Sequence, residues 1–193
     1  PGTIRSSQVA DIVQDKLGLI WIAGDCLYQY DGYHFRQYKD LGDGRGKLNP
    51  TDIHYLFYDS ITNRVLLGTH KYGIVAYNYK TDRLDVLPSK TAAPVIHQIT
   101  QTTDGRIWVV SHGSGLYYLD QDTLKVVSSI NKLYPLSLVA AGSKLYIGET
   151  SNVYVLENGK VIDQIALELP TTEIPVPIRI TAVHLDRSNK LWM

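Results

Sequence analysis

The sequence predicts an all-β protein made of four-stranded antiparallel units, and three observations carry this prediction. Apolar and polar residues alternate over short runs, which is the pattern of strands buried on one face. Turn-forming Asp, Asn and Gly residues separate these runs. A pattern of four such runs recurs at intervals close to 40 residues, and no apolar pattern with the helical period of about 3.6 is sustained.

Each repeat is anchored by one large side chain in its second strand. The anchors lie 38 to 46 residues apart and are Trp21, Leu66, Trp108, Tyr146 and Trp192. A polar turn precedes each anchor, and a small residue follows it, for example Gly68 after Leu66. A four-stranded sheet with two apolar faces buries both of them only by stacking on neighbouring sheets. Units of this length and strand number are therefore typical of the blades of a β-propeller.

The alignment of the anchors defines the blades in chain order. Complete blades are predicted over residues 9–38, 52–87, 95–128 and 136–165, and an incomplete fifth blade over residues 178–193. We therefore expect a truncated propeller with about four and a half blades, interrupted inside a strand at the C-terminal end. A β-sandwich with evenly spaced hairpins is the alternative fold, which the regular spacing of the anchors disfavours.

Charge and cysteine content narrow the possible functions. Lys plus Arg equal Asp plus Glu at 19 each, so the chain carries no basic field for nucleic acid or for an anionic membrane surface. Cys26 is the only cysteine, which excludes an intrachain disulfide, and its position after the Trp21 strand favours packing over nucleophilic chemistry. No apolar run approaches the ~18 residues of a membrane helix, and the first residues show no signal peptide.

Candidate ligand contacts lie in the loops between second and third strands and in the loops between blades, which share one face of a propeller. His70 and His112 occupy equivalent positions in adjacent units. The segment 39–52 is rich in glycine, matches neither a phosphate loop nor an EF-hand, and is expected to be flexible. The six candidate ligand-binding residues are Asp25, Arg45, His70, Lys71, Tyr72 and His112. They can hydrogen-bond to a sugar or stack on it, and a solvated polar surface is the alternative.

The sequence predicts no catalytic residue, no metal site and no cofactor. The two loop histidines have no evident third ligand, which a zinc site would need. No Ser/His/Asp arrangement and no pair of carboxylates can be argued from spacing. Most of the 14 tyrosines occupy alternating strand positions, which favours packing over carbohydrate binding.

The repeats resemble the two-component-regulator propeller repeat. That repeat reads as an acidic turn, Gly-x-(Leu/Ile)-Trp-Ile-Gly-Thr, Gly-Leu-x-x-Tyr-Asp and then an aromatic strand. "QDKLGLIWIAG" (residues 14–24) and "LYQYDGYHFRQY" (residues 27–38) match it closely, and residues 65–78 and 104–120 match well. The fourth unit matches less well, since its anchor is Tyr146 and its turn is shorter. The resemblance covers essentially the whole chain.

A second detail points to a particular branch of this family. The Asp31-Gly32-Tyr33 turn before Phe35 is similar to the first blade of hybrid two-component sensors from gut Bacteroides-type bacteria. This resemblance implies part of a seven-bladed propeller, the N-terminal one of two in a periplasmic sensor region. In that family a membrane helix, a histidine kinase and usually a receiver with a DNA-binding domain follow. The implied function is sensing of oligosaccharides from polysaccharide degradation, with no enzymatic activity in this fragment.

The expected partners follow from this interpretation. They are an oligosaccharide ligand, the other blades and sensor domains of the parent chain, and a second copy of the fragment, because exposed blade edges favour self-association. The fragment is expected to bind no nucleic acid and to reach a membrane only through its parent protein. Two alternatives remain open, a fragment of a propeller glycosidase or lyase and a protein-interaction scaffold. The turns at Asp15 and Asp104 do not match sialidase Asp-boxes, and the Gly-His and Trp-Asp signatures of WD40 repeats are missing.

Overall fold

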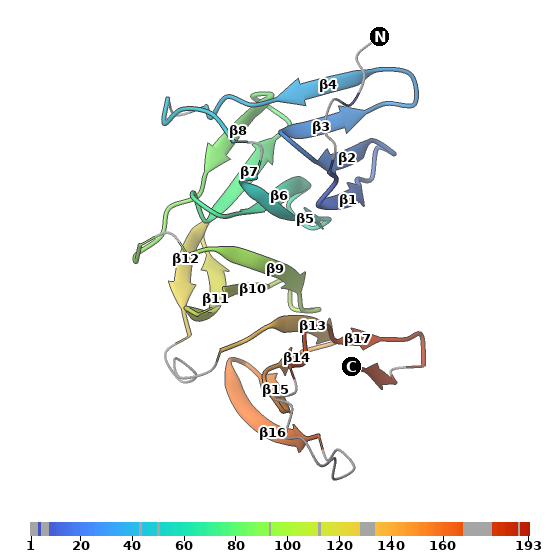
Figure 1. Ribbon diagram of the computed structural model, residues 1–193, viewed down its shortest axis with the longest axis vertical. Helices are drawn as coiled ribbons and strands as arrows, with labels where there is room; N and C mark the ends of the chain where they lie inside the picture. The colour runs from blue at the N-terminus through green and yellow to red at the C-terminus, as the bar shows by residue number, and fades with distance from the viewer. Residues whose placement is uncertain are drawn as a thin grey trace. The chain divides into compact units, whose positions relative to one another are not determined.

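The computed structural model is an all-β protein (Figure 1). It describes residues 4, 8–42, 44–49, 51–92, 94–111, 113–127, 134–167, 179–188 and 190–193. Every regular element within these ranges is a strand. The described residues accordingly include no helix that could cross a membrane. The predicted all-β class is confirmed.

The first two sheets have four strands each, in chain order. The first sheet contains β1 (Asp11–Gln14), β2 (Ile20–Ala23), β3 (Leu27–Tyr30) and β4 (Phe35–Tyr38). The second sheet contains β5 (Ile53–Asp59), β6 (Arg64–Thr69), β7 (Ile74–Asn78) and β8 (Arg83–Val86). Neighbouring strands pair in antiparallel register. The first strand of the second sheet, β5, packs against β1 and β2, so the two sheets stack as successive blades do.

The next two sheets repeat this order, and a hairpin follows them. The third sheet contains β9 (Ile96–Gln101), β10 (Ile107–Ser111), β11 (Gly115–Asp120) and β12 (Thr123–Val126). The fourth contains β13 (Ser137–Ala141), β14 (Lys144–Gly148), β15 (Asn152–Glu157) and β16 (Lys160–Ala166). The hairpin consists of β17 (His184–Leu185) and β18 (Leu191–Trp192), and β17 packs beside β13.

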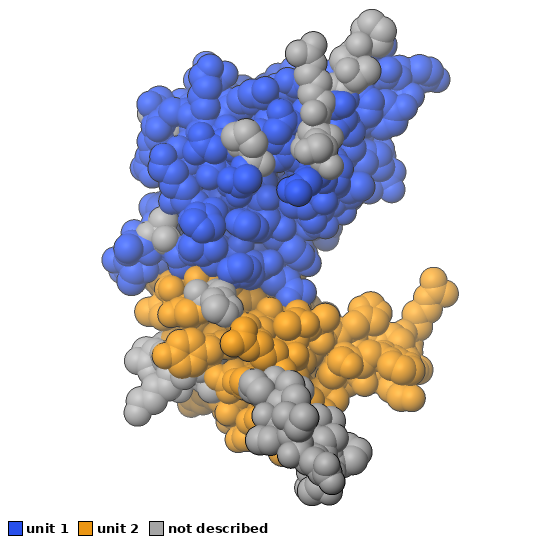
Figure 2. All heavy atoms as spheres, in the orientation of Figure 1, with its two compact units in different colours: residues 1–99, 121–124 blue, residues 100–120, 125–193 orange. Residues whose placement is uncertain are grey.

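The chain divides into two compact units (Figure 2), residues 1–99 with 121–124 and residues 100–120 with 125–193. The core of the first unit surrounds Trp21, which is fully buried. Leu67 and Tyr77 of the second sheet belong to the same apolar cluster. Trp21 therefore packs between neighbouring sheets, as predicted for an anchor.

The core of the second unit is built in the same way around Trp108. Its cluster contains Leu138 and Leu145 from the fourth sheet. The apolar side chains of the first sheet's other face form a smaller cluster in the first unit, with Cys26 buried beside Tyr28. Cys26 is a packing residue, as expected, and its burial raises the pKa of the thiol.

Each of the three anchor tryptophans makes the same type of hydrogen bond. In each case the indole nitrogen donates to a side chain six positions earlier, in the turn between the first two strands of the unit. The pairs are Trp21 Nε1 to Asp15 Oδ2 at 2.8 Å, Trp108 Nε1 to Thr102 Oγ1 at 3.0 Å and Trp192 Nε1 to Asp186 Oδ2 at 3.0 Å. The polar turn thus fixes the orientation of the apolar anchor that follows it.

The small residues after the anchors allow close packing of consecutive blades. A Cβ atom on Gly68 would lie 2.7 Å from Ile96 Cγ2, and one on Gly148 would lie 2.7 Å from Ile180 Cγ2. Both contacts bring the second strand of one blade against the start of the next blade. Any larger residue would push the two apart, because buried atoms are already in van der Waals contact.

A candidate ligand-binding pocket

The segment 39–52 lies against the sheets instead of projecting freely. Leu41 and Leu48 are buried, each 4% exposed, in the core around Trp21. Asp40 and Lys47 form an antiparallel bridge, which folds the segment back on itself, and Leu41 bridges Leu84 of β8. The expectation of a flexible loop is therefore wrong for its described residues, because the two leucines of a glycine-rich stretch anchor it.

The loop between β6 and β7 is held by hydrogen bonds at its base. Thr69 Oγ1 donates to the Gly73 carbonyl oxygen and accepts from the Tyr72 backbone nitrogen, both at 2.9 Å. The His70 backbone nitrogen donates to the Asp52 carbonyl oxygen at 2.8 Å. Gly73 has a φ of 68°, in the left-handed region that glycine adopts without strain. The side chains at the tip are consequently presented from a defined backbone.

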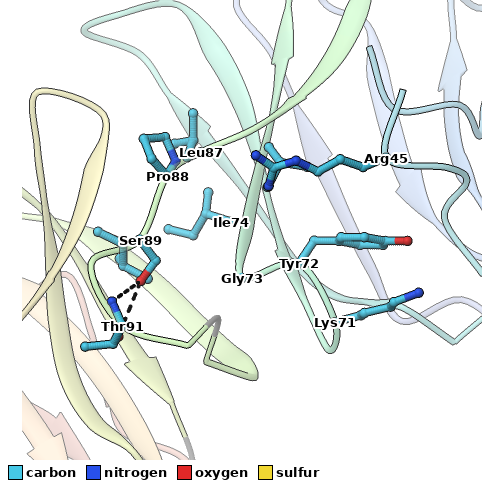
Figure 3. Close-up of a pocket in the computed structure, with 11 residues that line it drawn as sticks. Arg45, Lys71, Tyr72, Gly73, Ile74, Leu87, Pro88, Ser89 and Thr91 are labelled. Carbon is cyan, nitrogen blue, oxygen red and sulfur yellow. Dashed lines mark hydrogen bonds between the residues drawn. The ribbon is translucent and has the colours of Figure 1, made fainter. Parts of the chain in front are cut away.

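These two segments, the connecting segment that follows β8 and Leu124 of β12 surround a pocket of about 330 Å³ (Figure 3). All of its lining residues belong to the first unit. They are Arg45, Lys71, Tyr72, Gly73, Ile74, Val86, Leu87, Pro88, Ser89, Thr91 and Leu124. Small-molecule sites generally occupy about 300–1,000 Å³, so the pocket has room for a small ligand or for one end of an oligosaccharide.

Three of the six sequence-predicted candidates meet at this pocket. Arg45 comes from the segment 39–52, while Lys71 and Tyr72 come from the β6–β7 loop. The Lys71 ammonium lies 5.1 Å from the centroid of the Tyr72 ring, and the Tyr72 hydroxyl donates to the Lys47 carbonyl oxygen at 3.4 Å. The loop between second and third strands therefore lies on the same face as segments that connect blades, as the sequence predicts.

Asp25 lies elsewhere and is engaged by its own blade. Its Oδ1 accepts a hydrogen bond from the Tyr28 hydroxyl at 2.5 Å, and its Oδ2 lies 3.9 Å from Lys39 Nζ. Asp25 does not line the pocket around Arg45. Its contacts are those of a residue that ties β3 to the start of segment 39–52.

His70 has different neighbours from those expected. The centroid of its ring lies 5.7 Å from that of His54 on β5, and His54 lies 5.9 Å from His97 on β9. Partial desolvation lowers the pKa of His54, the His70 imidazole lowers it further, and Asp52 opposes the shift. The expected partner, His112, lies outside the described residues.

Sequence reasoning missed His54 and His97, although a signal was present. Each follows an isoleucine at the start of the first strand of its blade, so the two positions are equivalent. His54 lines a second pocket of about 370 Å³, together with Gly24, Thr51 and Ile53. No group of side chains suited to a metal ion is found in the described part of the chain.

The pocket around Arg45 also contains residues that the sequence alone did not single out. Ser89 and Thr91 follow β8, and Figure 3 shows them across the pocket from Arg45. Ile74 and Leu124, which are 1% and 2% exposed, supply apolar walls. A polar residue in a connecting loop carries no distinctive spacing, so these hydroxyls could be assigned to a site only from the folded chain.

The sequence was compared with protein families and with curated proteins. No family model matches the chain, and no curated protein matches it either. The chain is, however, similar in fold to many solved structures.

One similar structure is a streptogramin B lyase, with a TM-score of 0.72, 18% sequence identity, and 100% of this chain matched to 63% of that one. A second is the extracellular domain of a hybrid two-component system from B. thetaiotaomicron, with a TM-score of 0.71, 20% identity, and 97% of this chain matched to 27% of that one. A third is the β-propeller domain of Swd1 from Myceliophteria thermophila, with a TM-score of 0.54, 15% identity, and 78% of this chain matched to 57% of that one.

The chain spans less than two thirds of the length of each of these proteins. The similarity therefore concerns their architecture and not their activities. Together with the sheet order, it establishes the fold. The chain has the fold of part of a β-propeller, with four four-stranded blades and, among the described residues, two strands of a fifth.

Proposed function

We propose that this chain is a ligand-binding fragment of the extracytoplasmic sensor region of a hybrid two-component signalling protein. Its ligand is an oligosaccharide released during polysaccharide degradation. The similarity in fold to the extracellular domain from B. thetaiotaomicron supports this proposal, as does the two-component-regulator pattern in the repeats. The observation that carries it is the pocket around Arg45, which four separate segments of the chain build on the loop face of the blades.

The composition of the pocket favours binding over catalysis. None of its described lining residues is a carboxylate, an imidazole or a thiol. Glycoside hydrolysis generally uses a pair of carboxyl groups on opposite sides of the scissile bond. Hydroxyl groups, an aromatic ring and cations beside apolar walls are instead groups that orient and hold a sugar. One of the similar structures is a lyase, so enzymatic activity is the alternative function. An assay for cleavage products distinguishes it from ligand binding.

The proposal is tested by the thermal stability of this chain in the presence of oligosaccharide panels. A ligand that binds only the native state raises the midpoint of unfolding, and the increase grows with the logarithm of the ligand concentration relative to its dissociation constant. We expect at least one class of oligosaccharide to do so, without appearance of cleavage products in the same mixture.

A matched pair of variants localises the binding. Thr91→Trp places a large ring at the pocket and is expected to abolish the stabilisation by the ligand. Thr103→Trp makes the same change at an exposed turn outside the pocket and is expected to leave it intact. The proposed function is contradicted if no oligosaccharide stabilises the chain, or if the two variants lose binding equally.

A further inference from the structure

We propose that two copies of this chain associate head to tail. The hairpin that carries Trp192 in one copy packs on the first sheet of the other copy, on the face that points away from the second sheet. The proposal rests on two exposed surfaces that are equivalent to the two sides of the blade interfaces inside the chain. It is independent of ligand binding, because neither surface includes a residue of the pocket around Arg45.

Inside the first unit, the second sheet packs against the anchor of the first sheet. The residues of the second sheet that contact the core around Trp21 lie on one face, because successive strand residues point to opposite faces. Register pairs them across the strands, with Leu56 opposite Leu67 and Val65 opposite Tyr77. The face consists of Leu56, Val65, Leu67, Val75, Tyr77 and Leu84, each at most 3% exposed. A face that packs against an anchor is thus apolar and almost completely buried.

The first sheet has an equivalent apolar face on the side away from the second sheet. The alignment of the anchors matches the two faces position by position, and the pairing of Ile12 with Ile22 corresponds to that of Leu56 with its partner. This receiving face consists of Ile12, Ile20, Ile22, Tyr28, Tyr30 and Phe35. Ile12 is 57% exposed, whereas the equivalent Leu56 is 3% exposed. The receiving face therefore has the composition of a blade interface and leaves apolar surface in water.

The residue that already covers part of the receiving face is compatible with an anchor. Ile4 packs against the buried cluster on this face, and it lies eight positions before Ile12. Leu48 occupies the equivalent position before Leu56. Leu48 and Trp21 belong to the same buried cluster, so a residue at this position and an anchor pack on one face together. Ile4 therefore does not exclude an anchor from the receiving face.

The second unit repeats the same interface. Trp108 is 3% exposed and packs in one cluster with residues of the fourth sheet. Those at positions equivalent to the receiving face are Leu138, Leu145, Ile147 and Leu156. Because two interfaces bury an anchor against the same positions, this contact is a property of the repeat.

Trp192 is an anchor that is oriented but not buried. Its ring is 53% exposed, although its indole nitrogen already donates to Asp186. The Lys190 ammonium lies 4.5 Å from the ring, and the equivalent Arg106 lies 5.5 Å from the ring of the buried Trp108. A cation at this position is therefore compatible with packing. The fixed orientation of the indole reduces the conformational entropy that docking costs.

A second copy supplies each surface with the partner that it fits. Each copy offers one anchor, Trp192, and one receiving face, which includes Ile12. Removing both side chains from water provides the driving force for association. Because the two surfaces differ, the contact is heterologous, and such contacts produce closed rings or open chains of copies.

The inference is tested by sedimentation velocity of the 193-residue chain over a range of micromolar concentrations. We expect species heavier than one chain, in a fraction that rises with concentration. Ile12→Lys is expected to raise the dissociation constant at least about tenfold, because docking would remove the introduced charge from water. Ile61→Lys makes the same change at a 64% exposed position in the β5–β6 turn, outside both surfaces, and should leave association unchanged. Circular dichroism verifies that both variants fold.

A mixture of two variants tests the head-to-tail geometry. Trp192→Ala removes the anchor and keeps the receiving face, whereas Ile12→Lys disables the receiving face and keeps the anchor. Neither variant is expected to associate by itself. Their mixture is expected to form a species with one copy of each and nothing larger, because one intact anchor and one intact receiving face remain in each pair.

Three results would overturn the inference. If the chain remains a single copy at every concentration, no second copy occupies the receiving face. If association occurs but Ile12→Lys and Ile61→Lys behave alike, it uses other surfaces such as the strand edges. If the mixture associates no better than the separate variants, the contact is not head to tail. None of these results bears on the proposed ligand binding, because the pocket around Arg45 contains neither Ile12 nor Trp192.

Discussion

Trp21 and Trp192 are equivalent anchor residues of two repeats, and they lie in different surroundings. Both indole nitrogens donate to an aspartate six residues earlier, Asp15 or Asp186, at 2.8 and 3.0 Å. Trp21 is completely buried, whereas Trp192 is 53% exposed. The local turn is therefore formed with or without a blade packed over it, and the burial of the anchor comes from the neighbouring blade.

The surroundings of the two rings explain this difference. The Trp21 ring lies 4.4 Å, centroid to centroid, from Tyr77 of the second sheet, with Tyr38 at 5.9 Å. Trp192 is approached by Lys190, whose ammonium lies 4.5 Å from its ring. A repeat thus supplies an oriented apolar side chain, and its contribution to stability depends on the next repeat in the stack.

The largest expected effect is that of removing the buried anchor. Trp21→Ala should lower the free energy of unfolding by about 3–5 kcal/mol, because a large buried ring leaves a cavity. Trp192→Ala should cause a much smaller loss, since about half of that ring is already in water. Urea unfolding followed by circular dichroism measures both values.

If Trp21→Ala does not fold, Trp21→Phe is measured in its place. This variant retains a ring but loses the indole hydrogen bond, and it is still expected to lose more stability than Trp192→Ala. Equal losses of unfolding free energy at Trp21 and Trp192 would contradict the comparison. They would mean that an anchor stabilises the chain through its turn and not through packing against the next blade.

A smaller effect is expected from the acceptors of the two indoles. Asp15 is buried, and its Oδ2 accepts from both Trp21 and the Tyr79 hydroxyl. Oδ1 of Asp15 accepts from the Leu17 and Leu19 backbone nitrogens, so in Asp15→Asn the amide nitrogen faces donors in either orientation. A polar group is left unpaired, which costs about 1–3 kcal/mol. The loss for Asp186→Asn should be smaller, because water replaces the bonds of an exposed side chain.

Urea unfolding of the single variants and of the double variant Asp15→Asn/Trp21→Phe measures the coupling between acid and indole. Purely additive losses would show that the hydrogen bond between them does not contribute to stability.

The smallest effect concerns pH. Hydrogen bonds from Ser188 and Trp192 hold the pKa of Asp186 below its ordinary value of 3.8. Because the folded pKa is the lower one, ionised Asp186 stabilises the native state above pH 3.8, and this contribution is lost as the pH falls through the folded pKa. NMR titration of the Asp186 carboxyl should give a midpoint below 3.8 in the native chain.

Trp192→Phe should move this midpoint up, and Trp21→Phe should leave it in place because its indole bonds to Asp15 instead. If both variants shift the midpoint equally, the lowered pKa of Asp186 does not come from its own hydrogen bond to Trp192.

Much of the architecture could be predicted because it depends on short-range patterns. The spacing of the anchors reflects alternation within strands and turn chemistry, both of which are local properties of the chain. Burial of Cys26 and stacking of Trp21 on the second sheet also followed correctly from their positions. The self-association expected from exposed blade edges stays a prediction.

The candidate site was harder to predict from the sequence than the architecture. Arg45, Lys71 and Tyr72 were recognised as loop residues, but Ser89 and Thr91 carry no pattern of their own. His70 lies near His54 because the start of β5 passes beside the β6–β7 loop. Such proximities depend on how loops close over the sheets, and alternation within a strand contains no information about them.

The amino-acid sequence by itself determined the repeat, its strands and the polar turn that precedes each anchor, because these depend on residues within one unit. Only the tertiary structure decided which anchors are buried, how Leu41 and Leu48 fix the segment 39–52, and which loop residues share a pocket. Those outcomes require contacts between residues far apart in the chain. Such contacts form only when one blade closes against another.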